Sequence, residues 1–205
     1  EYIAIAVRAD SPLKTGKEFV EAMKKAPASL SLALSSAPGG THHISFGLPL
    51  LSGGVDMSKV KLVVFTSSSE AVTALLGGHV DVISAGTVNV APHVASGKLR
   101  ALAVSSPKRM GGPLAVASTW PELGYKGVME NWRGIIGAKA ITAEQVAFWD
   151  NVFRRITASE DFRAYAEQNQ WDASYRGVEE SRKFMAAQYE ELKNVMTYLG
   201  LAKKQ

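Results

Sequence analysis

The sequence contains no cysteine, which excludes disulfide bonds, thiolate metal sites and cysteine nucleophiles. It also lacks any apolar run near the roughly 20 residues that a membrane-spanning helix needs, so we expect no direct membrane insertion. Aromatic residues are few, at 8% of 205 residues, whereas hydrophobic residues reach 46% and charged residues 20%. This composition is typical of a folded globular chain and of neither a disordered nor a fibrous one.

A strong charge of one sign is also missing. The formal net charge is +4, with 13 Lys/Arg against 9 Asp/Glu in residues 1–137 and 10 of each in residues 138–205. This excess is too small and too scattered for nucleic-acid binding, which needs basic residues gathered on one stripe. Two interpretations stay open: a solvated basic surface, or a weakly positive lobe suited to a small anion.

Catalytic motifs are absent as well. We find no Gly-x-Ser-x-Gly elbow, no Gly-x-Gly-x-x-Gly, no P-loop and no His-Glu-x-x-His. His42 and His43 are adjacent, and on a helix neighbouring side chains diverge by roughly 100°, so we expect no metal site and no cofactor. His43 beside Ser45 is the one weak candidate for a base and nucleophile pair.

Short apolar runs alternate with amphipathic stretches through the first two-thirds of the chain. Because strands separated by single helices form parallel neighbours, this order predicts an α/β fold with a doubly wound, mostly parallel sheet. We expect strands at 2–7, 30–34, 60–65, 80–84 and 99–104, and helices at 15–25, 41–51, 68–76 and 88–96. Gly47 and Pro49 weaken the second half of the helix at 41–51.

The last third has a different character. Residues 107–127 are rich in Gly and Pro and predict a loop, and 134–137 predict a short strand. Apolar residues at helical spacing then predict helices at 142–156, 159–165 and 178–199. The apolar stripe of the first of these carries Trp149, Val152, Phe153 and Ile156.

One arrangement occurs three times: a strand, then small polar residues, then the start of a helix. It appears at 35–42, 66–69 and 84–87. A helix start presents unpaired N–H groups and the positive end of the helix dipole, and small residues let an anion approach them. Since such junctions gather at the carboxyl ends of parallel strands, they predict an anion or carboxylate pocket, although Ser and Thr are also ordinary N-caps.

Two further motifs carry a family resemblance. Gly77-Gly78-His79-Val80-Asp81 is followed by Gly97-Lys98-Leu99-Arg100-Ala101-Leu102-Ala103-Val104-Ser105. This pair closely resembles the second lobe of the substrate-binding proteins of tripartite tricarboxylate transporters, the Bug family. The segments 7–12, 35–43, 121–125 and 131–134 are also similar to the family, so the resemblance covers nearly the whole chain.

The resemblance implies a periplasmic receptor of type II, Venus-flytrap architecture that binds a small organic carboxylate, has no catalytic activity and delivers its ligand to membrane transporter subunits. Residues 8–127 would form the second, ligand-binding lobe. Residues 1–7 and 128–205 would form hinge strands and the C-terminal helical part of the first lobe, most of whose N-terminal portion has no counterpart here.

By position, the resemblance also implies which residues bind the ligand. They are Ser36, Ala37, Gly40, Thr41, His42, Thr66, Ser67, Ser68, Ala85 and Gly86. Many relatives carry Asp where Ala85 stands, and a Lys or Tyr pair around Phe65-Thr66. Without that acidic partner, a plain di- or tricarboxylate is favoured over an amino-bearing ligand. Arg133 has two open interpretations, a bidentate carboxylate ligand or a hinge salt bridge with a partner such as Glu130.

Two other functions compete with this interpretation. The effector-binding domain of a LysR-type transcription regulator has similar architecture and length, but would follow a DNA-binding helix-turn-helix. An enzyme on a doubly wound sheet is the second alternative, because the fold alone does not decide function.

Overall fold

The computed structural model describes residues 1–35 and 37–201. Within it the chain divides into two compact units. Unit 1 contains Glu1 and Trp132–Lys193, and unit 2 contains Tyr2–Asn131 and the C-terminal residues from Asn194. Ser36 falls outside the described residues, so its predicted place in the site is not described further.

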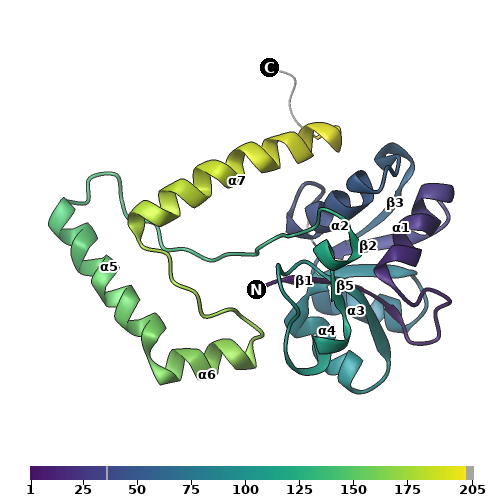
Figure 1. The fold of residues 1–205 in the computed structure, drawn as a ribbon, viewed down its shortest axis with the longest axis horizontal. Helices are drawn as coiled ribbons and strands as arrows, with labels where there is room; N and C mark the ends of the chain where they lie inside the picture. Colours follow the sequence, from purple (N-terminus) through teal and green to yellow (C-terminus); the bar gives the residue numbers. More distant parts are fainter. Residues whose placement is uncertain (36, 202–205) are drawn as a thin grey trace. The chain divides into compact units, whose positions relative to one another are not determined.

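Unit 2 is built on a 6-stranded sheet with the order β3-β2-β4-β1-β5-β6 (Figure 1). β2 is parallel to β3 and β4, and β5 is parallel to β6, which confirms the expected α/β class and the mostly parallel sheet. The strands are β1 (Ile3–Arg8), β2 (Ser31–Ser35), β3 (Lys61–Phe65), β4 (Val82–Gly86), β5 (Leu99–Val104) and β6 (Ser118–Thr119).

β1 departs from the pattern, because it runs antiparallel to both β4 and β5. Its run Ile3–Val7 is buried on both faces, and a continuous apolar run indicates burial but not direction. Residues expected at the hinge therefore lie inside the sheet of unit 2. One consequence is that α1, which follows β1, starts at the opposite edge of the sheet from α2, α3 and α4.

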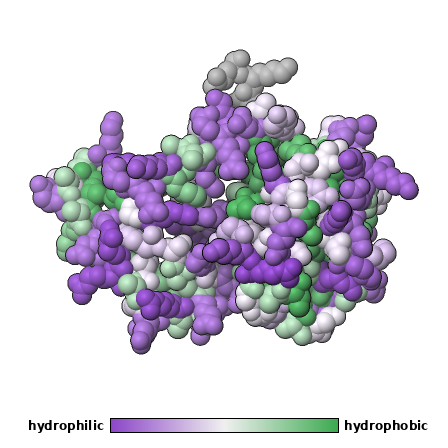
Figure 2. Space-filling view, viewed as in Figure 1, coloured by the Kyte–Doolittle hydropathy of each residue, from purple (hydrophilic) through white to green (hydrophobic). Residues whose placement is uncertain are grey.

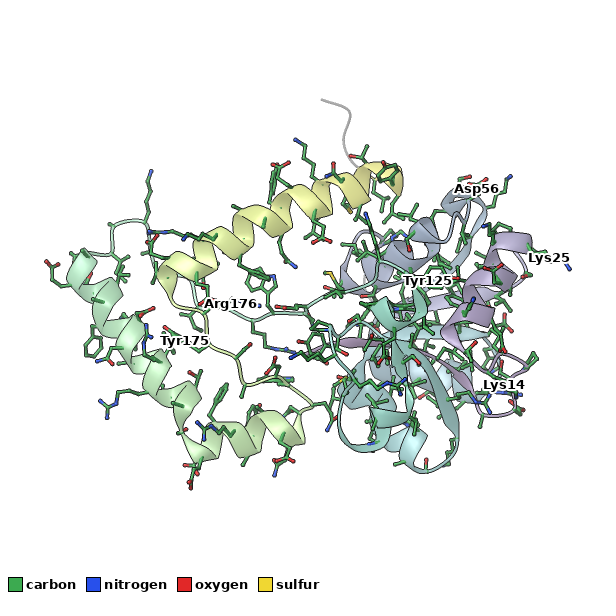
Figure 3. All side chains as sticks on the ribbon, in the orientation of Figure 1. Lys14, Lys25, Asp56, Tyr125, Tyr175 and Arg176 are labelled. Atoms are coloured by element: carbon green, nitrogen blue, oxygen red, sulfur yellow. The ribbon has the colours of Figure 1, made fainter. Side chains whose placement is uncertain are left out.

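Helices cover both faces of this sheet. Residues of α1 (Gly16–Lys25) and α2 (Thr41–Ser52) pack with Ile5 and Val7 on one face, and residues of α3 (Ser68–Leu76) and α4 (Thr87–Ala95) pack with Ala4 and Ala6 on the other. Alternate residues of one strand thus enter different cores, as the period of a strand requires. In Figure 3, Lys25 marks the C-terminal end of α1, and Lys14 lies in the loop before its start.

Local signals explain where these helices begin and continue. Thr15 and Glu18 form a capping box at the start of α1, an arrangement that satisfies two otherwise unpaired N–H groups. α2 runs through Pro49, whose carbonyl accepts a hydrogen bond from Gly53 N at 2.9 Å. Burial of the eight consecutive residues 43–50 of α2 outweighs the local cost of proline here.

The loop at 107–127 contains two short 3-10 helices, η2 (Gly112–Val116) and η3 (Pro121–Leu123), and another, η1 (Met57–Lys59), precedes β3. Trp120 is fully buried in this region. A Cβ atom on Gly127 would lie 2.4 Å from Cγ of Trp120, so only glycine fits at this position beside the indole ring.

Unit 1 contains α5 (Ala143–Ala158), α6 (Glu160–Gln168) and most of α7 (Val178–Tyr198). Asp150 of α5 accepts hydrogen bonds from Tyr175 OH at 2.8 Å and Val178 N at 3.1 Å. Tyr175, labelled in Figure 3, lies in the segment between α6 and α7. Arg154 donates to the same carboxylate at 2.9 Å, and the hydrogen bonds from Arg154 and Tyr175 lower the pKa of Asp150.

The strand expected at 134–137 does not form. Ile135 and Ile136 are 76% and 87% exposed, and the segment has no strand partner in the described part of the chain. A strand is stabilised by cross-strand pairing, so the apolar pattern alone was insufficient and this prediction was wrong.

Candidate functional site

The three predicted junctions lie at one edge of the unit 2 sheet. β3, β2 and β4 are consecutive, parallel neighbours, so their carboxyl ends are adjacent. Ser35 Oγ at the end of β2 lies 2.8 Å from Ser68 Oγ at the start of α3. Ser69 Oγ of α3 lies 3.5 Å from Asn89 Oδ1 of α4. Hydrogen bonds therefore join the second junction to the first and third.

The start of α2 is open toward this edge. Its N-cap is Gly40, which offers no side-chain acceptor to the first N–H groups of the helix. Thr41 and His42 are half-buried at this start, whereas Ala37 in the preceding loop is exposed. The first turn of a helix has no intrahelical acceptors for its N–H groups, so α2 offers donors and a positive dipole end here.

His42 and Ser35 form a close pair. The Nδ1 atom of His42 lies 2.7 Å from both the backbone oxygen and the hydroxyl of Ser35. Because a carbonyl oxygen can only accept, Nδ1 must carry the proton. His42 Nδ1 is therefore not available as a base toward Ser35, which argues against nucleophilic catalysis by this pair.

His43, the next residue, is buried. Its Nδ1 accepts a hydrogen bond from the backbone N–H of Gly39 at 2.9 Å. Burial lowers the pKa of His43, which favours the neutral ring that this bond requires. The weak enzyme candidate His43 beside Ser45 thus contains an imidazole whose Nδ1 is already used by the backbone.

The start of α3 differs from that of α2, because it carries its own carboxylate. Ser67 is the N-cap and accepts from Glu70 N at 3.2 Å. Glu70 Oε2 in turn accepts from Thr66 N at 3.0 Å and Thr66 Oγ1 at 2.7 Å. These hydrogen bonds, the one from the Thr66 hydroxyl first, lower the pKa of Glu70. Thr66 and Ser67 are thus engaged with Glu70, whereas Ser68 contacts Ser35.

The start of α4 has no side-chain cap and is buried. Ala85 is fully buried, and Gly86 serves as N-cap without a side-chain hydrogen bond. The backbone N–H of Thr87 is bound to Tyr2 O at 3.1 Å. Within the described residues, the hydroxyls of Ser84 and Thr87 are buried and make no hydrogen bond. Buried hydroxyls normally have a partner, and Ser45 Oγ and Trp120 Nε1 are in the same state away from this edge; of these four groups, only that of Thr87 stands at the helix start itself.

The site has little positive side-chain charge in unit 2. No Lys or Arg occurs in residues 26–58 or 62–97, which contain all three junctions. Backbone N–H groups, hydroxyls and helix dipoles are therefore the anion-stabilising groups that these segments supply. No group of three or more His, Asp or Glu residues suited to a metal ion occurs among the described residues.

Arg133 belongs to unit 1, whereas the other described residues of the predicted site belong to unit 2. Its Nη2 atom lies 2.8 Å from Glu1 Oε2, and the Glu1 side chain is only 6% exposed. The guanidinium also stacks over Trp171, 4.2 Å from the ring centroid. The ion-pair partner is thus Glu1, where the sequence suggested Glu130.

Sequence reasoning missed Glu70. It placed Ser35 and Thr87 within the predicted junctions and named His43 as a weak base, but it counted none of the three among the ligand-binding residues. The spacing Ser67-x-x-Glu70 is a capping-box signal, so Glu70 was recognisable as part of the α3 start. The hydrogen bonds of Ser35 and His43 depend on loop geometry that no local pattern indicates.

The model of the tripartite tricarboxylate transporter family receptor matches residues 2–201. The chain belongs to this receptor family. The match confirms the resemblance seen in the sequence and decides against a LysR-type regulator. No helix in the described part of the chain is both long and apolar enough to span a bilayer.

Relatives of known sequence or structure agree with the family. The chain is 30% identical over 203 residues to the UPF0065 protein in the gbd 5' region of Cupriavidus necator, covering 98% of this chain and 60% of that protein. A TctC solute binding protein from Polaromonas, without ligand, shares 26% identity and a TM-score of 0.75, covering 98% of this chain and 65% of that one.

A third similar structure is R. palustris Rpa4515 with adipate, at 19% identity and a TM-score of 0.76 over 98% of this chain and 66% of that one. At this identity the likeness shows the fold. The chain thus spans about two-thirds or less of the length of these relatives.

Proposed function

We propose that this chain is the ligand-binding part of a periplasmic solute receptor that captures a small di- or tricarboxylate for membrane transporter subunits, without chemical catalysis. The observation that carries the proposal is the pair of open helix starts, α2 at Gly40 and α4 at Gly86, at one sheet edge. The unpaired buried hydroxyl of Thr87, the first residue of α4, supports it.

The proposed ligand contacts follow from this geometry. The backbone N–H and the hydroxyl of Thr41 would donate to one carboxylate, and Gly40, whose own N–H is bound to Ala37 O, would leave room for it to approach. Ala85 and Gly86 would leave room for it to approach α4. Ser35 accepts from His42 and can donate to Ser68, so Ser68 could turn its own hydrogen to the ligand. Ala37, Thr66 and Ser67 would line the rim.

The resident carboxylate of Glu70 makes α3 the least attractive of the three starts for an anion, because like charges repel. Arg133 would contribute to binding only by exchanging Glu1 for the ligand. The adipate in the structure of R. palustris Rpa4515 supports a carboxylate as ligand. Family membership supports the transporter partner and the periplasmic location.

Titration calorimetry on the protein with succinate, malate, adipate and citrate tests the proposal. The matched controls are the corresponding neutral amides, which have similar shape and lack the charge. We expect saturable binding of at least one carboxylate and none of its amide. Equal binding of acid and amide, or no binding of any carboxylate, would contradict the proposed function.

A further inference from the structure

We infer that His43 is a positioning residue of the proposed site: its Nδ1 lone pair holds the Gly39 amide, and thereby sets the loop 37–40 that leads into α2. The relevant geometry is the hydrogen bond of 2.9 Å from Gly39 N to His43 Nδ1. The part of the inference that concerns ligand affinity rests on the proposed function, whereas the part that concerns loop order does not.

Other contacts also hold the described residues 37–40 of this loop. Gly39 adopts a φ of +88°, a left-handed conformation that glycine enters without strain. Gly40 N donates to Ala37 O at 2.9 Å, closing the turn. On its other side Gly39 packs against Met196 of α7, since a Cβ atom at Gly39 would lie 2.8 Å from Met196 Cε. The imidazole of His43 thus ties Gly39 to α2 by a side-chain hydrogen bond, while His42 ties Ser35 to the same helix.

Rigidity of this turn matters for anion binding, because a dipolar site is effective only when its N–H groups are already aimed at the ligand. His43 lies in the first turn of α2 and is 4% exposed, so packing fixes its ring. Its burial, which lowers the pKa of the ring, keeps the acceptor unprotonated near neutral pH.

Two adjacent histidines therefore hold opposite tautomers. Nδ1 of His42 carries its proton because it faces the Ser35 carbonyl, whereas Nδ1 of His43 is a bare acceptor and its proton resides on Nε2. Nitrogen NMR of the imidazole rings distinguishes these states. An Nδ1-protonated His43 would overturn the inference without any ligand.

Three substitutions separate the function of the acceptor from packing. His43→Asn places an amide oxygen where Nδ1 lies, His43→Gln places polar atoms near Nε2, and His43→Leu removes both. We expect exchange of the Gly39 amide hydrogen to accelerate roughly tenfold or more in the Leu and Gln variants, and within about threefold of the parent in the Asn variant. We likewise expect the Leu and Gln variants to lose affinity for the carboxylate that binds to the parent, and the Asn variant to keep most of it.

The outcomes are distinct. Unchanged Gly39 exchange in folded His43→Leu, judged by near-UV circular dichroism, overturns the inference. Rescue by Gln and not by Asn overturns it too, because Nε2 would then be the acting atom. If the parent binds no carboxylate, the proposed function fails, while the exchange and nitrogen data still decide whether His43 sets the loop. Exchange that accelerates without loss of affinity overturns the link to the ligand.

Discussion

The carboxylate of Glu70 binds both polar hydrogens of Thr66, through the backbone N–H at 3.0 Å and the hydroxyl at 2.7 Å. Glu70 lies four residues after Thr66, and its carboxylate places one of the protein's own negative charges at the start of α3. Of the three helix starts at this sheet edge, α2 and α4 remain without a side-chain cap. The edge therefore presents an uneven electrostatic surface to an anion.

Glu70→Gln should strengthen carboxylate binding. The substitution keeps the shape and an oxygen acceptor for Thr66 but removes one negative charge from the edge. We expect the dissociation constant to fall roughly two- to fivefold, the order of one partly screened charge several ångströms away. Titration calorimetry at low and at high salt measures the change, which should shrink at high salt.

Glu18→Gln provides the matched control. Glu18 also stabilises a helix start, accepting from Lys14 N and Thr15 N, but α1 follows an antiparallel strand and begins at the opposite sheet edge. Glu18→Gln changes the net charge by the same amount as Glu70→Gln and should leave the affinity for the carboxylate unchanged. An equal gain in both variants would show a general charge effect and no special position of Glu70.

Thr41→Val should weaken binding. Valine keeps the shape at the first residue of α2 and removes one hydroxyl donor, so a buried carboxylate would be left one hydrogen bond short. We expect a loss of about 1–3 kcal/mol in binding free energy. Thr73→Val, which removes a hydroxyl bound to Ser69 O further along α3, should bind as the parent does. Undiminished affinity of Thr41→Val would place the ligand elsewhere.

Hydrophobic periodicity predicted much of the unit 2 fold. The strand at 99–104 and the helix at 68–76 coincide with β5 and α3, because apolar runs and capping residues are local signals. The direction of β1 was not readable from Ile3–Val7, because a strand buried on both faces looks the same in either direction. Residues 134–137 have a strand pattern without a strand partner.

The arrangement of the candidate site could be predicted from the sequence only in part. Strand order brings the three junctions together, so their meeting at one edge followed from the α/β pattern. Whether each helix start is open did not follow, because that depends on where Glu70 and His43 point. The ion pair of Arg133 with Glu1 joins the beginning of the chain to a segment more than a hundred residues later, which no local pattern encodes.

Arg133→Lys should lower stability more than affinity. Lysine can still approach Glu1 but cannot stack a planar guanidinium on Trp171. We expect a loss of about 0.5–1 kcal/mol in unfolding free energy, the size of an exposed cation–π contact. Arg182→Lys, at an exposed pair with Glu179 on α7, is the control and should change little. Reduced affinity at unchanged stability would instead make Arg133 a ligand of the carboxylate.

Stability should fall as pH drops below the ordinary histidine range, in part because of His43. The folded-state pKa of His43 is lowered by burial, so the unfolded chain takes up the proton first. Its contribution is fully present above the unfolded pKa of about 6.5 and is lost as pH falls toward the folded pKa. Thermal unfolding from about pH 8 to pH 5 should show a smaller decline in His43→Asn than in the parent. An identical decline would assign the pH dependence to other groups.

The 205-residue polypeptide should associate or bind a hydrophobic dye through α5. No residue of this helix is buried, and Phe148, Trp149 and Ile156 are 61%, 48% and 46% exposed. Figure 2 shows hydrophobic side chains at the surface over this helix, among mostly hydrophilic residues. An apolar patch of this kind is typical of a surface that another protein segment covers.

Light scattering and dye fluorescence measure the effect. Phe148→Gln combined with Ile156→Gln should reduce both association and dye binding, because it breaks the apolar stripe while the helix keeps its capping box at Thr142 and Gln145. Val116→Thr, which alters an apolar side chain of unit 2 that is even more exposed, at 75%, should leave both unchanged, because a single exposed residue makes no patch. A monomer that binds no dye would show that the α5 stripe is covered within this chain in solution.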